Sequence, residues 1–178
     1  MAWNAPITFV GNAQLTAAQL NAQLRDNLLE TMPGKATIPG SYFVTTGPNT
    51  VSQRNWFSFF ADPAVNVSST SYTNAGGPSI WVPTTSRALV LLSANMASGI
   101  VNSTTHMSVA VSGATTIGAN DERSLAQRST NGSTPERQMM KLVVFTNLNP
   151  GENTFTSMCR VTSGTGVFQR RRLTVLPF

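Results

Sequence analysis

The order of apolar and polar residues divides the chain into a helical start and a long remainder of short strands. Between Leu15 and Glu30, apolar residues recur every three or four positions, as on one face of an α-helix. This stripe consists of Ala17, Leu20, Leu24 and Leu28. Thr16 and Gln19 have the spacing of a capping box, which satisfies two amide groups that a helix otherwise leaves unpaired at its start. The pattern therefore predicts an amphipathic helix over residues 15–30.

The predicted helix needs an apolar partner. A helix of about four turns is only marginally stable by itself in water, so its narrow stripe has to be buried. Two alternatives follow: the stripe packs on its own domain, or it docks on another protein or on copies of the same chain. Met32-Pro33-Gly34 ends the helix, and a connector punctuated by Pro and Gly continues to Gly40. Residues 1–40 are therefore predicted to form an anchor arm, and residues 41–178 a separate domain.

Short apolar segments separated by Gly, Pro, Asn or Ser clusters fill the predicted second domain, after an aromatic-rich segment at Trp56–Phe60. The predicted strands are Ala64–Thr73, Ser79–Val82, Ala88–Met96, His106–Ser112, Gln138–Thr146, Asn153–Thr162 and Val167–Leu176. Strands do not alternate with helical segments, so the pattern does not indicate a parallel α/β sheet. The predicted fold class is mainly β, an antiparallel β-sandwich or jelly roll preceded by one N-terminal amphipathic helix.

Two kinds of strand pattern occur in this domain. Residues Met107–Val111 alternate between apolar and small or polar side chains, which predicts a half-buried antiparallel strand. Ala88–Leu92 and Leu142–Phe145 are continuously apolar, which predicts strands that are covered on both faces. Asn149–Glu152 has Pro and Gly at its centre and fits a type II turn, with the glycine at positive φ.

No constellation of catalytic or metal-binding residues stands out in the sequence. His106 is the single histidine and has no carboxylate close to it in sequence, so we interpret it as an exposed strand residue. Asp121-Glu122 follows Gly118-Ala119-Asn120 and is interpreted as a solvated turn. A glycosidase-type pair of carboxylates stays open, because sequence spacing does not show which carboxylates meet. The single cysteine, Cys159, excludes an internal disulfide and is predicted to lie in the core. We therefore predict a non-enzymatic protein without metal or cofactor.

The distribution of charge favours protein partners over nucleic acid. The net charge is +5, but charged residues make up only 11% of the chain. Within Arg170-Arg171-Arg172, strand alternation directs Arg171 away from the side of Arg170 and Arg172, which splits the basic cluster. Because the planar guanidinium group suits protein interfaces, we expect these arginines at a subunit interface, with a structural ion-pair role as the alternative. We expect no nucleic-acid binding.

No targeting or membrane-spanning pattern is present in the sequence. Polar residues interrupt the early apolar positions, so no signal peptide fits the start, and no apolar run reaches the length of a membrane span. We expect a chain that is made as a soluble protein and does not insert into a membrane.

The opening residues resemble the start of a known class of proteins. Trp3–Gly11 is WNAPITFVG, Leu15–Asn21 is LTAAQLN and Leu24–Leu28 is LRDNL. This succession of a tryptophan, a short extended piece and a helix resembles the N-terminal region of small virion structural proteins of tailed bacteriophages, often called minor tail proteins. The similarity covers the residues up to the end of the predicted helix. Ser69–Met96 and Asn149–Phe178 resemble the β-rich ends of those proteins only loosely.

The resemblance implies a non-enzymatic virion structural protein with an anchor fixed to the particle and an outward β-sandwich that touches the host surface. The implied partners are other virion proteins and further copies of this chain, with a trimer favoured. We expect Trp3, Phe9, Leu20, Leu24 and Leu28 to form the assembly anchor; local packing of Trp3 or Phe9 on the helix is the alternative. A minor tail or fibre-like component is favoured, with capsid-surface decoration as the alternative position.

A carbohydrate-binding module for host recognition is a second alternative function. Such modules stack sugar rings on exposed aromatic side chains beside polar groups. Trp56, Trp81 and Tyr72 are the candidate contacts for a host-cell glycan. Trp81 lies between Ile80 and Val82 in a predicted strand, so a place in the core fits it equally well.

Overall fold

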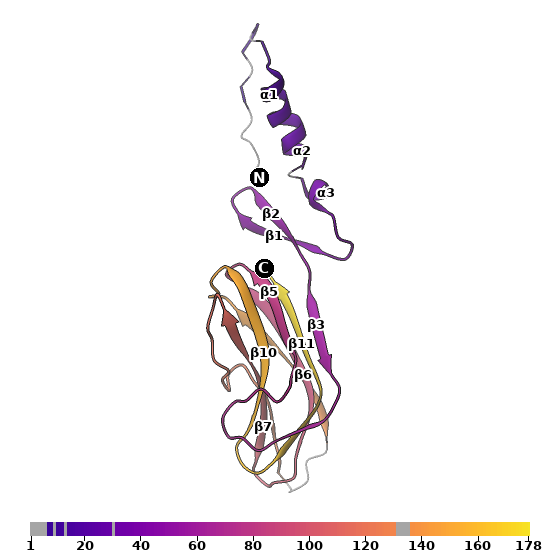
Figure 1. Cartoon of the computed structure of the whole chain (residues 1–178), viewed down its shortest axis with the longest axis vertical. Coiled ribbons are helices and arrows are strands. Elements are labelled where there is room, and N and C mark those ends of the chain that lie inside the picture. The colour runs from indigo at the N-terminus through magenta and orange to yellow at the C-terminus, as the bar shows by residue number, and fades with distance from the viewer. Residues whose placement is uncertain (1–6, 9, 13, 30, 131–135) are drawn as a thin grey trace. The chain divides into compact units, whose positions relative to one another are not determined.

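The computed structural model describes residues 7–8, 10–12, 14–29, 31–130 and 136–178. The chain forms two compact units, of which the first comprises Met1–Asn55 with Phe178 and the second Trp56–Pro177 (Figure 1). Antiparallel sheets dominate the described residues, with helical structure only near the N-terminus. The predicted fold class, a β-sandwich preceded by a helix, is confirmed.

The helical run of the first unit begins at its predicted cap. It consists of α1 (Ala17–Leu20), the π-helical segment η1 (Asn21–Asp26) and α2 (Asn27–Leu29), and a separate turn, α3 (Met32–Lys35), follows. The Gln19 backbone N–H donates to the Thr16 hydroxyl oxygen at 3.2 Å, and the Thr16 backbone N–H donates to Gln19 Oε1 at 3.0 Å. The capping box is therefore confirmed. The π-helical segment was not predicted.

A β-hairpin that the sequence pattern did not predict completes the first unit. Its strands are β1 (Tyr42–Gly47) and β2 (Thr50–Arg54), joined by a turn in which Asn49 has φ of 54°. Lys35 Nζ donates to the Val51 carbonyl oxygen at 3.1 Å, and the Thr37 hydroxyl donates to Gln53 Oε1 at 2.8 Å. These bonds attach the hairpin to the connector. The boundary between the units therefore lies after Asn55 and not after Gly40, where we expected it.

Two antiparallel sheets form the second unit (Figure 1). The four-stranded sheet has the order β5 (Ser79–Thr84), β10 (Gly151–Val161), β7 (Thr104–Gly113) and β8 (Leu125–Arg128). The five-stranded sheet has the order β3 (Phe57–Ala61), β11 (Gly166–Pro177), β6 (Ala88–Ser98) and β9 (Arg137–Phe145), and β4 (Val65–Val67) also pairs with β11. Strands β3 and β9 are the two edges along this order.

Alternating side chains of both sheets form one core. Phe155, Phe168 and Leu92 are completely buried, and the Phe155 ring meets the Phe145 ring edge-on with centroids 5.7 Å apart. Cys159 is 1% exposed, and burial raises the pKa of its thiol to about 12. The prediction that Cys159 belongs to the core is confirmed, and the thiol stays protonated at neutral pH.

A β-bulge in β11 sets the places of the three consecutive arginines. The register with β6 shifts between Gln169 and Arg172, and Arg170 adopts φ of 49° there. Arg171 turns inward, is 2% exposed, and donates from Nη1 to the Ala75 carbonyl oxygen at 2.9 Å. Because Arg171 is buried in its own domain, the expected role of this residue at a subunit interface is wrong. Arg170 and Arg172 are exposed.

The strands β5, β6, β7, β9, β10 and β11 lie where the sequence predicted strands. Other details differ. The predicted strand Ala64–Thr73 is reduced to the short β4. Strands β3 and β8 were not predicted, and β8 has only four residues. The runs in β6 and β9 were predicted to be covered on both faces, but Leu142 and Val144 are 54% and 61% exposed. That prediction is therefore wrong for β9, whereas Leu89 and Leu91 on the same side of β6 are partly buried.

Candidate functional site

The apolar stripe of the helix is the most unusual surface of the first unit. We call its three leucines, Leu20, Leu24 and Leu28, the leucine stripe. These side chains are 48%, 56% and 65% exposed, whereas the polar residue Asn27 is only 5% exposed. The Asn27 side-chain amide donates to the Gln23 carbonyl oxygen at 3.3 Å, which satisfies part of its hydrogen bonding. The helix thus turns a polar residue inward and its leucines outward, the reverse of a surface helix that packs on its own domain.

The exposure of these leucines decides between the two predicted environments of the helix, its own domain or another protein surface. Packing of the leucine stripe within its own domain does not occur, because all of its side chains are about half exposed or more. Leu15 and Leu29, which lie outside the stripe, are also exposed, at 49% and 52%. Trp3 and Phe9, the other expected anchor residues, lie outside the described residues.

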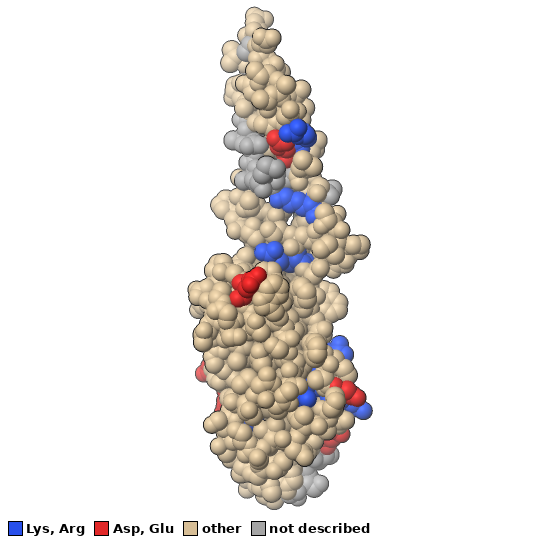
Figure 2. Space-filling view, in the orientation of Figure 1, with Lys and Arg blue, Asp and Glu red and all other residues tan. Residues whose placement is uncertain are grey.

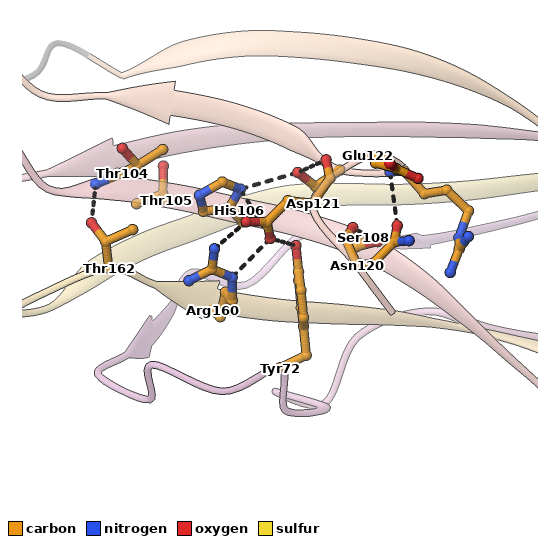
Figure 3. A network of polar contacts seen from close by, with 12 residues as sticks. Tyr72, Thr104, Thr105, His106, Ser108, Asn120, Asp121, Glu122, Arg160 and Thr162 are labelled. Carbon is orange, nitrogen blue, oxygen red and sulfur yellow. Dashed lines mark hydrogen bonds and ion pairs between the residues drawn. The ribbon is translucent and has the colours of Figure 1, made fainter. Parts of the chain in front are cut away.

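A second candidate site is a cluster of polar side chains on the outer face of the four-stranded sheet. Arg160 of β10 and His106 of β7 are directly opposite each other in the strand register. The loop between β7 and β8 carries Asp121 over them, and the loop after β4 brings Tyr72 (Figure 3). We call Tyr72, His106, Asp121, Ser124 and Arg160 the polar cluster.

Asp121 is the centre of the polar cluster, and Arg160 and Tyr72 both point toward it (Figure 3). Arg160 Nε donates to Asp121 Oδ1 at 3.0 Å, and Arg160 Nη2 donates to Asp121 Oδ2, which makes a bidentate ion pair. The Tyr72 hydroxyl donates to Asp121 Oδ1 at 2.8 Å. The hydrogen bonds from Arg160 and then Tyr72 lower the pKa of Asp121 from 3.8 to about 2. This carboxylate is therefore ionised throughout the neutral range.

His106 is buried under the same loop. It is 8% exposed, so the interpretation of an exposed strand residue is wrong, because the β7–β8 loop covers the outer face of β7. The Ser124 hydroxyl donates to the Asp121 carbonyl oxygen at 2.9 Å. The same hydroxyl oxygen lies 3.0 Å from His106 Nδ1, within hydrogen-bond distance. Burial, and then the charge of Arg160, lower the pKa of His106 below 6.5, and Asp121 opposes this shift.

The hydrogen bonds of the polar cluster join parts of the chain that lie far apart in the sequence. Within the β7–β8 loop, the Ser124 hydroxyl also bonds to the Asp121 carbonyl oxygen. Asp121 is held ionised by Arg160, so it is a poor proton donor at neutral pH. The cluster instead fixes two loops on the sheet. Among the described residues, no group of His, Cys, Asp and Glu has an arrangement that fits a metal ion.

The polar cluster predicts how stability depends on pH. Because the folded state holds the pKa of His106 below 6.5, the unfolded chain takes up a proton first as the pH falls, and stability falls below pH 6.5. The lowered pKa of Asp121 adds a second loss between pH 3.8 and about 2. We expect His106→Gln to remove the first loss and Asp121→Asn the second, in thermal melts recorded as a function of pH. Unchanged pH profiles in both variants would contradict this assignment.

The three candidate glycan contacts lie on different elements of the second unit. Trp56 and Trp81 are 57% and 58% exposed, so the alternative that Trp81 lies in the core is wrong. Trp81 lies on β5 in the four-stranded sheet, and Trp56 precedes β3 in the five-stranded sheet. Tyr72 is engaged within the polar cluster, with the Arg160 guanidinium 5.4 Å from its ring centroid.

Charged side chains are sparse on the molecular surface. On the face shown in Figure 2 they form small separate groups on a largely uncharged surface. The three consecutive arginines do not form one patch, since Arg171 is buried and the Arg172 guanidinium lies 5.1 Å from the centroid of the Phe60 ring. No helix among the described residues is long and apolar enough to cross a membrane.

Comparisons with known proteins give structural similarities only. No protein-family profile matches the chain, and no curated protein does. A structure of infectious bursal disease virus, Gx strain, has 10% identity and a TM-score of 0.48 over 78% of this chain and 36% of that chain. The crystal structure of the infectious bursal disease virus VP2 subviral particle has 12% identity and a TM-score of 0.47 over 78% and 37%. This chain thus spans little more than a third of the length of those chains.

Proposed function

We propose that this chain is a non-enzymatic structural component of a virion, attached through the leucine stripe of its N-terminal helix. The observation that carries the proposal is that Leu20, Leu24 and Leu28 are exposed on a helix whose buried residue is the polar Asn27. Burying one leucine contributes roughly 1.5 to 3 kcal/mol, so a stripe of this size suits docking on an apolar surface of another protein. The β-sandwich from Trp56 to Pro177 is a compact unit of its own, which the helix attaches to the particle.

The resemblance of Trp3–Gly11 and Leu15–Leu28 to minor tail proteins supports a virion as the place of docking. It favours a minor tail or fibre-like component over a capsid-surface decoration protein. The hydrogen bonds of the polar cluster support the non-enzymatic part of the proposal, because they engage His106 and Asp121 with partners inside the domain.

Quantitative mass spectrometry of purified particles of the virus that encodes this chain tests the proposal. We expect the chain in washed particles at a constant ratio to the main structural protein, across preparations. A chain that is abundant in the infected-cell lysate but absent from washed particles would contradict the proposal. An unrelated protein of similar abundance in the lysate is the control for carry-over.

A glycan-binding module is the second candidate function, and the exposure of Trp81 favours it. The ring stands on a sheet face beside Thr154, and Ser112 follows on the next strand of the same row, so both offer hydroxyl groups to a sugar. A glycan array probed with the full chain tests this function: binding that Trp81→Ala abolishes supports it, and absence of binding contradicts it.

A further inference from the structure

The outer face of the five-stranded sheet carries apolar side chains on all four strands of its main order, seven among eleven positions. The strand register places Met140 beside Ser93, Arg172 and Phe60 in one row, and Leu142 beside Leu91, Thr174 and Ser58 in the next. Val144, Leu89 and Leu176 form the third row. We call these three rows the apolar face. Within it, Met140, Leu142, Val144 and Phe60 are 69%, 54%, 61% and 46% exposed.

The opposite side of the sandwich shows what a solvated sheet face of this protein contains. On the outer face of the four-stranded sheet, Ser79 and Thr156 pair across β5 and β10, and their hydroxyl oxygens are 2.9 Å apart. Thr154 and Ser112 form the adjacent pair. Apart from Trp81, these rows carry small or hydroxyl side chains. The two outer faces therefore differ in kind, and only one has the composition of a buried surface.

The apolar face also explains the continuous apolar runs in β6 and β9. Runs such as Ala88–Leu92 and Leu142–Phe145 are typical of strands that are covered on both faces. In the single chain the outward residues of the β9 run are exposed, and those of the β6 run are only partly buried. In addition, β9 is an edge strand along the main order, and an exposed apolar edge invites pairing with another chain. Both observations call for a covering partner.

The size of the apolar face suits a protein–protein interface. Its exposed fractions correspond to on the order of 500 Å² of apolar surface, with about 150 to 250 Å² for each large side chain. Homodimer interfaces are about 65% apolar, so this amount fits a patch near 800 Å² per partner, roughly that of a stable standard-sized interface.

We propose that the apolar face is covered by a second copy of this chain. The eleven positions of this face include one charged residue, Arg172, and no carboxylate, so a single cation is all that it offers to a charged partner or an anionic lipid surface. Contact between identical copies places apolar surface on apolar surface. The Arg172 guanidinium, already stacked on Phe60, keeps its charge at the margin of the contact. This inference does not depend on attachment to a virion.

Light scattering on the full chain over a range of concentrations tests the inference. We expect the wild type to have a mass that is a multiple of 19.0 kDa. The double variant Leu142→Asp/Val144→Asp is expected to raise the dissociation constant by at least about a hundredfold, since it removes apolar burial and places charge in the contact. The matched control is Ile100→Asp/Val101→Asp, which changes two apolar residues that are 46% and 52% exposed in the β6–β7 turn, off the apolar face.

The control variant is expected to associate like the wild type. A wild type that is monomeric at every concentration would overturn the inference, as would a Leu142→Asp/Val144→Asp variant that associates as strongly as the control. If the Leu142→Asp/Val144→Asp variant associates as strongly as the control, the chain associates through another surface, such as the leucine stripe. If the Asp variant does not fold, Leu142→Thr/Val144→Thr keeps β-forming side chains at both positions and takes its place. Its expected loss of association is smaller, on the order of tenfold, because it removes apolar burial without adding charge.

Discussion

Replacing Leu20 and Leu24 together by Asp is expected to remove the chain from assembled particles and to leave the β-sandwich folded. Both side chains are about half exposed in the single chain, so the change costs little in the isolated protein. In a docked state it removes two buried leucines, each worth roughly 1.5 to 3 kcal/mol, and lowers the association constant by more than about a hundredfold. The measurement is the amount of chain per particle, together with the thermal melt of the isolated protein.

Leu15→Asp/Leu29→Asp is the matched control for this prediction. It makes the same chemical change at two leucines that are 49% and 52% exposed but lie outside the stripe. Incorporation close to that of the wild type is expected for the control. Equal incorporation of both double variants would show that the leucine stripe does not attach the chain.

Phe155→Ala is expected to have the largest effect on stability. Its ring is completely buried between the sheets, and it meets the Phe145 ring edge-on at 5.7 Å. Removal of a buried phenylalanine leaves a cavity and costs about 3 to 5 kcal/mol in the free energy of unfolding. Urea denaturation of the full chain measures this loss through the midpoint of the transition.

Phe59→Ala provides the control, because it removes the same side chain from a position that is 53% exposed at the edge strand β3. We expect it to cost less than about 1.5 kcal/mol, since about half of the ring is already in water. Equal losses in the two variants would mean that Phe155 is not part of a closely packed core.

Local chemistry was sufficient to predict most of the fold. The capping box of Thr16 and Gln19 fixes the helix start with short-range hydrogen bonds, so sequence spacing reveals it. The strands around Val109 and Phe155 have clear apolar patterns with turn residues at their ends. Strand β8 was missed, because four residues give too short a pattern to distinguish a strand from a loop.

The polar cluster could not be predicted, because it depends on contacts between distant parts of the chain. Asp121 is 39 residues from Arg160 and 49 residues from Tyr72, and neither spacing carries a local signal. The same loop buries His106, which a strand pattern alone places on the solvent side. The burial of Arg171 was missed for a related reason. Strand alternation predicted the side of the strand on which Arg171 lies, but not its hydrogen bond to the distant Ala75 carbonyl oxygen.

The continuous apolar runs in β6 and β9 are not fully buried in the single chain. Pattern reasoning predicted that Leu142 and Val144 are covered, and the single chain leaves both exposed. The same holds for the stripe that contains Leu24, which is more than half exposed. In both places the sequence is better matched to an assembly than to an isolated chain, which is the physical basis of the two surfaces proposed above.

A map of the purified particle that resolves the neighbours of residues 17–29 would show directly whether the leucine stripe attaches the chain. We expect the helix to be seated on another virion protein, with Leu20, Leu24 and Leu28 buried in that contact. A map in which the chain is attached only through its β-sandwich, with the leucine stripe facing solvent, would contradict it.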